Sequence, residues 1–152
     1  MGDLRGSDLH PDYDALINER LLGYHWINYP WYDGTIKQLL WHDDMGQPRG
    51  DDFGRLSDGR LFSWDMDQPS TDLVSAWAMV EAVYARHGAW MQVGINPDFL
   101  QNSRRPGRYV GSIHGGNVAY KRPECNHYAF ADSPALALCR AACEALGIEV
   151  KA

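Results

Sequence analysis

Residues 133–147 read SPALALCRAACEALG, and this stretch decides the class of fold. Ser133 suits the N-cap of a helix and Pro134 its first turn, while Gly147 suits the residue that follows the last turn. The apolar residues between these signals recur at helical spacing and form one stripe: Leu136, Cys139, Cys143 and Leu146. Because the segment is also rich in alanine, it predicts a helix that packs closely against a sheet.

Two further helices follow from the same kind of signal. The segment from Pro11 to Leu22 ends before Gly23, which predicts a helix over residues 11–22. Ser70 or Thr71, followed by Asp72, supplies an N-cap and a first-turn anion for another helix that ends near His87 and Gly88. The expected buried stripe of this helix is Leu73, Ala76, Trp77, Val80 and Val83 or Tyr84.

Between the helices the pattern changes to period two or to runs rich in β-formers, which predicts strands. The expected strands are Thr35 to His42, Arg60 to Trp64, Trp90 to Ile95, Arg108 to His114, Asn117 to Lys121 and Asn126 to Ala131. Gly115 and Gly116 join two of them and favour a hairpin with a type I′ turn. The segment from Asp43 to Asp58, rich in Asp, Gly and Pro, predicts a surface loop.

The order of these elements predicts an α+β fold in which a largely antiparallel sheet packs with about three helices. A chain of 152 residues is long enough for one hydrophobic core. We expect a disordered leader over residues 1–10 and a single domain over residues 11–152. No apolar run is long enough for a membrane span or a signal peptide, and three cysteines, an odd number, do not suggest a disulfide framework. These features favour a soluble, intracellular protein.

Charge is distributed unevenly along the chain. The formal net charge is −6, yet residues 99–123 contain no acidic side chain and five basic ones. The counterpart is the stretch from Asp43 to Asp67, which is rich in aspartate. An acidic chain repels long nucleic acids, whereas a local basic segment can hold a small anion. The alternative is that the basic and acidic segments neutralise each other across a surface.

Three blocks of the chain carry a resemblance to a known family. They are NERLLGYHW at 18–26, PSTDLVSAWAMVEAV at 69–83 and SPALALCRAACEALG at 133–147. Together they resemble the phage ABA sandwich domain, which occurs in small phage and prophage proteins. The resemblance implies an α/β/α layered domain located in the cytoplasm of the infected bacterial host, without a transferable enzymatic activity. The chain departs from the family pattern in residues 29–32 and in the Asp-rich loop.

Signatures of metal binding and catalysis are weak in this sequence. Cys125, His127, Cys139 and Cys143 contain ligand types for zinc, but their spacing is poor, and the last two share an apolar helical face. The Asp-rich loop lacks the pattern of a calcium-binding loop. No histidine stands in a recognisable pairing with serine, cysteine or a carboxylate. We therefore expect no catalytic residues, no metal and no cofactor.

Aromatic residues concentrate near the N-terminus. Tyr24 and Trp26 belong to the first of the three blocks and are expected in the core. Tyr29, Trp31 and Tyr32 fall where a loop is expected, and a loop cannot bury three large rings by itself. The sequence therefore leaves open whether they pack in the core, against another subunit or another protein, or on a ligand.

The basic segment supplies the strongest candidate for an anion site. Arg104, Arg105 and Arg108 offer planar, bidentate donors that match a phosphate group. Amide side chains can read the edge of a base. The candidate ligand-binding residues are Asn102, Arg104, Arg105, Arg108, Tyr109, Asn117, Arg122, Trp31 and Tyr32. The alternative is a basic loop that faces the acidic loop of a neighbouring subunit.

These observations favour a non-enzymatic protein that binds a small phosphorylated or nucleotide-like ligand, as a homo-oligomer. In the context of the phage resemblance, such a protein is similar to the sponges of the Thoeris anti-defence group, which sequester nucleotide second messengers. The alternative is a phage accessory protein that mediates a protein–protein interaction through an exposed aromatic loop.

Overall fold

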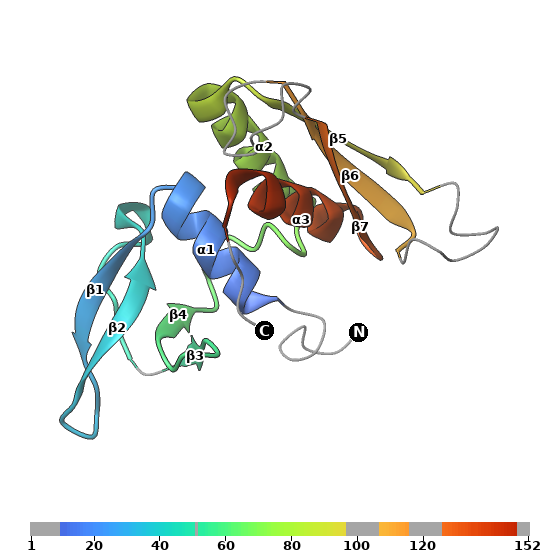
Figure 1. Ribbon diagram of the computed structural model, residues 1–152. Helices are drawn as coiled ribbons and strands as arrows, with labels where there is room; N and C mark the ends of the chain where they lie inside the picture. Colours follow the sequence, from blue (N-terminus) through green and yellow to red (C-terminus); the bar gives the residue numbers. More distant parts are fainter. Residues whose placement is uncertain (1–9, 51, 97–106, 116–125, 149–152) are drawn as a thin grey trace.

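The computed structural model describes residues 10–50, 52–96, 107–115 and 126–148. Its elements follow one another along the chain as shown in Figure 1. They are α1 (Pro11–Leu21), β1 (His25–Pro30), β2 (Ile36–Trp41), the 3-10 turn η1 (Asp43–Met45), β3 (Phe53–Arg55), β4 (Leu61–Ser63), α2 (Leu73–His87), β5 (Trp90–Ile95), β6 (Tyr109–His114), β7 (Asn126–Ala131) and α3 (Pro134–Leu146). The predicted α+β class is confirmed.

The strands form two sheets. The first has the order β1-β2-β4-β3, in which only the β2–β4 pair is parallel. The second is antiparallel throughout, with the order β5-β6-β7. In Figure 1, α1 and α3 lie between the two sheets, so the order of the layers differs from the α/β/α order that the resemblance implies.

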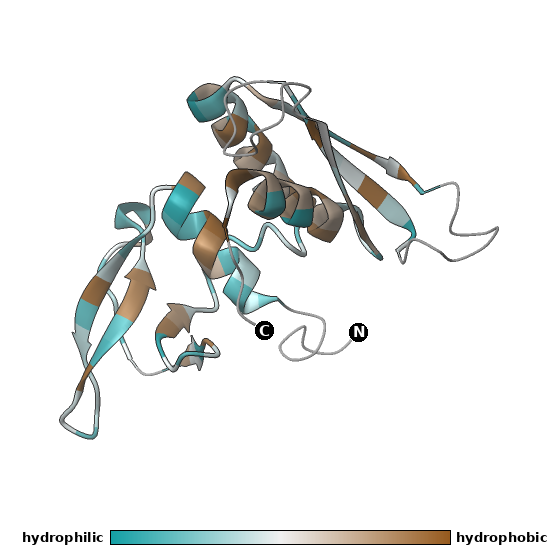
Figure 2. Ribbon diagram, in the orientation of Figure 1, coloured by the Kyte–Doolittle hydropathy of each residue, from teal (hydrophilic) through white to brown (hydrophobic). Residues whose placement is uncertain are grey.

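Helix α3 covers the inner face of the second sheet. Ser133 caps it by accepting a hydrogen bond from Leu136 N at 3.2 Å, and Gly147 ends it with φ at 71°. The approach is close because β6 carries Gly111, where a Cβ atom would overlap the carbonyl of Ala137. Figure 2 shows hydrophobic residues along most of α3, which agrees with a helix buried between a sheet and two other helices.

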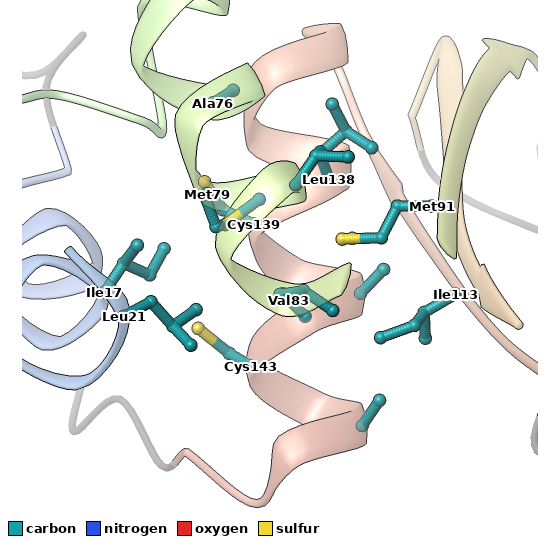
Figure 3. Packing of buried hydrophobic residues seen from close by; sticks show 14 of the residues in the cluster. Ile17, Leu21, Ala76, Met79, Val83, Met91, Ile113, Leu138, Cys139 and Cys143 are labelled. Atoms are coloured by element: carbon teal, nitrogen blue, oxygen red, sulfur yellow. The ribbon is translucent and has the colours of Figure 1, made fainter. Parts of the chain in front are cut away.

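The main core lies where the three helices meet the second sheet. Figure 3 shows Cys139 and Cys143 of α3 in this core, together with Ile17 and Leu21 of α1 and Met79 of α2. The two thiols are 0% and 2% exposed. Their predicted burial on the apolar face of the helix is confirmed, and burial raises the pKa of Cys143 to about 12.

The bounds of helix α2 agree with the prediction, but its stripe of buried residues differs from the predicted one. Asp72, rather than Ser70 or Thr71, is the N-cap and accepts hydrogen bonds from the backbone N–H groups of the first turn. Leu73 and Trp77, which we expected to be buried, are at least half exposed, and of the two alternatives Val83 and Tyr84 it is Val83 that is buried. The apolar residues of α2 lie on two faces of the helix. The neighbours α1, α3 and β5 pack on only one of these faces, which is formed by Ala76, Met79, Val80 and Val83.

Helix α1 anchors the connection between β4 and α2 through buried polar groups. Asp14 is 1% exposed and accepts a hydrogen bond from Ser70 N at 2.8 Å. Asn18 is fully buried, and its Nδ2 donates to the carbonyl of Asp67 at 2.8 Å. These bonds fix the segment that follows β4 against α1, the helix that links the first sheet to the main core.

Four further expectations need correction or lie beyond the structure. Strand β1 was not predicted, and β3 lies inside the predicted Asp-rich loop. The predicted hairpin between residues 108–114 and 117–121 is wrong, because β5 and β7 pair with both edges of β6 over its whole length. Residues 117–121 and most of the expected leader, residues 1–9, lie outside the described residues.

Candidate functional site

The described structure separates the candidate residues that it includes. Asn102, Arg104, Arg105, Asn117 and Arg122 lie outside the described residues. Trp31 and Tyr32 follow β1 at the tip of the first sheet, whereas Arg108 and Tyr109 stand at the start of β6 in the second sheet. Figure 1 shows the helices between these two places. Trp31 and Tyr32 therefore cannot belong to the same site as Arg108 and Tyr109 within one chain.

Trp31 has an intramolecular place that the sequence did not reveal. Its side chain is 9% exposed and packs in a cluster with Leu39, Trp41 and Leu61. Tyr29 lies in β1, where its ring meets Phe53 edge-on and its hydroxyl donates to Gly50 O at 2.7 Å. Of the alternatives that the sequence left open for these two rings, packing within the chain is the one observed, because β1 and β2 form a hairpin that packs them onto the sheet. Only Tyr32 is exposed, at 79%.

The start of β6 is held by a buried asparagine. Asn96 is 2% exposed, and its Nδ2 donates to Gly107 O at 2.9 Å. Its backbone N–H donates to Arg108 O at 2.8 Å, which continues the β5–β6 ladder by one residue. Tyr109 points inward, where it packs with Ala131 and the start of α3. Arg108 is exposed and, by strand alternation, lies on the opposite side of the sheet from Tyr109.

We call the side of the second sheet that faces away from α3 the outer face. The inner side carries the buried residues Met91, Ile113 and Ala129. Alternation and register then place the following residues on the outer face: Trp90, Gln92, Gly94, Arg108, Val110, Ser112, His114, Tyr128 and Phe130. An antiparallel sheet that only meets water on one side normally carries polar residues there. This outer face carries Gln92, Arg108, Ser112 and His114 as polar residues, but it also carries the aromatic and apolar side chains of Trp90, Val110, Tyr128 and Phe130.

Three rings form a row across the outer face at the His114 end of β6. The rings of Trp90 and His114 stack at 5.6 Å with an interplanar angle of 28°. Tyr128 meets His114 edge-on at 5.8 Å. Trp90 and Tyr128 remain 51% and 54% exposed. The Trp90 ring also lies so close to Gly115 that a Cβ atom there would clash with it. The row therefore offers broad aromatic surface to a planar ligand.

A serine beneath the row orients the histidine. Ser112 Oγ lies 2.8 Å from His114 Nε2, because residues two apart on a strand share a face. This pairing corrects the expectation that no histidine pairs with a serine. The hydrogen bond fixes the imidazole plane against Trp90. Sequence reasoning missed the row because its members come from three strands, and only the spacing of Ser112 and His114 could have suggested part of it.

The outer face leaves open space between the row and Arg108. Gly94 lies between them on β5, and a Cβ atom added to it would meet nothing within 4 Å. Val110 and Phe130, its neighbours across the sheet, are half-buried. From Arg108 to Ser112 the backbone of β6 spans about 14 Å. We call this part of the outer face, with an arginine at one end and aromatic rings at the other, the shelf.

A separate pocket of about 170 Å³ lies between α1 and the first sheet. The Arg60 guanidinium lies 3.9 Å from the centroid of the Trp26 ring, and Arg60 Nε donates to Asp58 at 2.7 Å. The chain thus covers the aromatic surface of this pocket with its own arginine. Tyr24 beside it is buried as expected, whereas Trp26 is only half-buried. The pocket is a weaker candidate than the outer face, since Arg60 already covers the Trp26 ring.

The described residues contain no group of three or more potential metal ligands. Within the same ranges, no helix is long and apolar enough to cross a membrane. Comparison with protein-family models, curated proteins and solved structures finds no match for this chain. Any function must therefore be inferred from the site itself.

Proposed function

We propose that this protein binds a small, phosphorylated, nucleotide-like ligand on the outer face of the second sheet. The observation that carries the proposal is the exposed aromatic row of Trp90, His114 and Tyr128. A planar base can stack on these rings, and such stacking contributes about 1–3 kcal/mol per base. The role is that of a binding protein rather than an enzyme.

Charge supports the same face. Strand β6 lies entirely within the acid-free segment, residues 99–123, and Arg108 stands at its start. Asn96 holds the Arg108 backbone in place, so the guanidinium extends from a fixed base. A phosphate at this end of the shelf would accept charge-assisted hydrogen bonds from Arg108. Arg104, Arg105, Arg122, Asn102 and Asn117 belong to the same acid-free segment and are proposed to add donors to the ligand.

Calorimetric titration tests the proposal, with cyclic dinucleotides, cyclic trinucleotides and ADP-ribose-type compounds as ligands. Tyr128→Ala should weaken binding by about 1–3 kcal/mol because it removes a stacking surface. Tyr32→Ala is the matched control, since it removes an exposed tyrosine from the first sheet. If the parent chain binds none of these compounds, the proposal fails. Equal loss in both variants would place the ligand elsewhere.

The arginine is tested separately. Arg108→Ala should weaken binding by about 1.5–3 kcal/mol, and Arg108→Lys should recover only part, since an ammonium cannot form the bidentate fork. Arg55→Ala, at an exposed arginine of β3, serves as control. Binding that is unchanged in Arg108→Ala would show that the phosphate lies elsewhere. In the phage setting that the resemblance implies, such binding would sequester an immune second messenger in the infected cell.

A second candidate function rests on the tip of the first sheet. Tyr32 and Ile36 are 79% and 64% exposed, Tyr32 within the β1–β2 turn and Ile36 at the start of β2. This tip is the part of the aromatic loop that remains available for a protein–protein interaction. Loss of a copurifying protein partner in Tyr32→Ala, with ligand binding unaltered, would support this alternative.

A further inference from the structure

Gln92 is an exposed polar residue of β5 that lies beside the aromatic row. Its register partner on β6 is Ser112, and Ser112 pairs in turn with Tyr128 of β7. Gln92 and Tyr128 therefore flank the small Ser112 side chain, with their Cα atoms about 10 Å apart. Trp90 stands two residues before Gln92 and shares its face of the sheet. Gln92 thus adjoins two of the three rings on which a base can stack.

The side-chain amide of Gln92 is available to a ligand. Within the described part of the chain it forms no hydrogen bond. Its polar neighbours on β6 differ in this respect, because Ser112 Oγ and His114 Nε2 bond to each other at 2.8 Å. An amide has N–H donors and a carbonyl acceptor side by side, so it can form two hydrogen bonds with one edge of a base. Gln92 can therefore recognise a base that stacks on the aromatic row.

The charges near Gln92 favour adenine over guanine. The strands β5, β6 and β7, which lie wholly within the described ranges, contain no aspartate or glutamate. One edge of guanine presents the donors N1–H and N2–H₂, which a carboxylate can accept together. Its other edge presents two acceptors, N7 and O6, which arginine or lysine binds, and Arg108 lies at the other end of the shelf. Adenine presents the donor N6–H₂ next to an acceptor, which is the pattern that a glutamine amide matches.

We infer, building on the proposed function, that Gln92 recognises the base and that the ligand of the outer face is an adenine nucleotide. The ligand then lies along β6, with its base at the row of Gln92 and Tyr128 and its phosphate at Arg108. The ribose lies between them, beside Gly94. A Cβ atom added to Gly94 would meet nothing within 4 Å, so this position leaves room for the sugar. The sequence of groups along the shelf therefore follows the order of base, sugar and phosphate in a nucleotide.

Calorimetric titration of the full chain with base-matched ligands tests the inference. The pairs are cyclic di-adenylate with cyclic di-guanylate, cyclic tri-adenylate with cyclic tri-guanylate, and ADP-ribose with GDP-ribose. The parent chain should bind the adenine member of a pair about tenfold more tightly, because a bidentate contact discriminates between bases by about this factor. Equal affinities, or tighter binding of guanine, would overturn the inference and leave the proposed function standing. If no member of any pair binds, both fail.

Two substitutions of Gln92 test its role in the preference. Gln92→Leu keeps a side chain of similar size without hydrogen bonds and should make the affinities for the two members of a pair nearly equal. Gln92→Glu should reverse the preference, because a carboxylate accepts from both N–H groups of guanine and cannot donate to adenine. Gln47→Glu is the matched control, since it adds the same charge at an exposed glutamine between η1 and β3 and should keep the parent preference. An adenine preference that persists in Gln92→Leu would show that another residue recognises the base.

Discussion

The buried carboxyl of Asp14 should make the stability of this protein fall between pH 4 and pH 7. Burial raises the pKa of Asp14 from 3.8 to about 7, although the hydrogen bond from Ser70 N works in the opposite direction. Below pH 3.8 both folded and unfolded chains hold the proton. As the pH rises, the unfolded chain releases it first, so the folded state loses stability until the pH passes 7.

The size of this loss of stability follows from the two pKa values of Asp14. Since a tenfold change in proton affinity is worth 1.36 kcal/mol, a pKa of about 7 in the folded chain against 3.8 in the unfolded chain lowers the free energy of unfolding by about 4 kcal/mol above pH 7. Asp14→Asn keeps an oxygen that can accept the hydrogen bond from Ser70 N but cannot ionise. The new amide also adds a donor one helical turn before Asn18, whose buried Oδ1 has no hydrogen-bond partner among the described residues. We therefore expect the variant to match the parent chain near pH 4 and to exceed it increasingly up to pH 8.

Urea denaturation at a series of pH values measures this difference. At each pH, the free energy of unfolding of the parent chain is subtracted from that of the variant, which cancels the pH dependence of all other groups. Asp12→Asn is the matched control, since Asp12 lies in the first turn of the same helix and accepts a hydrogen bond from Ser57 N. If the difference between Asp14→Asn and the parent chain stays constant from pH 4 to pH 8, Asp14 is ionised in the folded protein and the reasoning is refuted.

Two substitutions in the cores complete the predictions. Cys143→Ala should lower the free energy of unfolding by about 1 kcal/mol, and a chelator should leave the melting temperature unchanged, because the thiol packs on Ile17 and Leu21 in the main core; stoichiometric zinc in the purified protein would contradict this. Trp31→Ser should cost about 3 kcal/mol or more in urea denaturation, since the indole fills the cluster with Leu39 and Trp41; an unchanged unfolding midpoint would contradict that packing.

The sequence predicted the elements that local signals define. Caps and prolines located the three helices, and the β-rich runs at Trp90–Ile95 and Asn126–Ala131 have the same bounds in the structure. It missed β1 because Pro30 and the crowded aromatic residues suggested a loop. Proline is tolerated there because β1 is an edge strand and Pro30 is its last residue. The pairing of β6 with β7 joins residues across eleven or more intervening positions, which no local turn signal encodes.

The candidate site was harder to predict than the fold for a related reason. Arg108 could be proposed from charge alone, because the surrounding segment lacks acids. The aromatic row requires the register that places Trp90 opposite His114 and Ser112 opposite Tyr128. A shift of one residue in either pairing would turn these side chains toward α3. Register depends on how the sheet packs on the helix, so it could not be read from the strands separately.

The place of each tryptophan in the fold indicates function better than the clustering of aromatic residues along the sequence. Trp26, Trp31, Trp41 and Trp64 all pack in or against the small cores of the first sheet. Trp77 and Trp90 are more than half exposed, on α2 and on the second sheet. Burial of an indole ring is favourable by several kcal/mol. An exposed indole would gain this energy if its helix or strand rotated inward. The opposite sides of the two elements already contribute Ala76 of α2 and Met91 of β5 to the main core, which opposes such a rotation. Among the described residues both rings therefore stay more than half exposed, and under the proposed function the ligand covers Trp90.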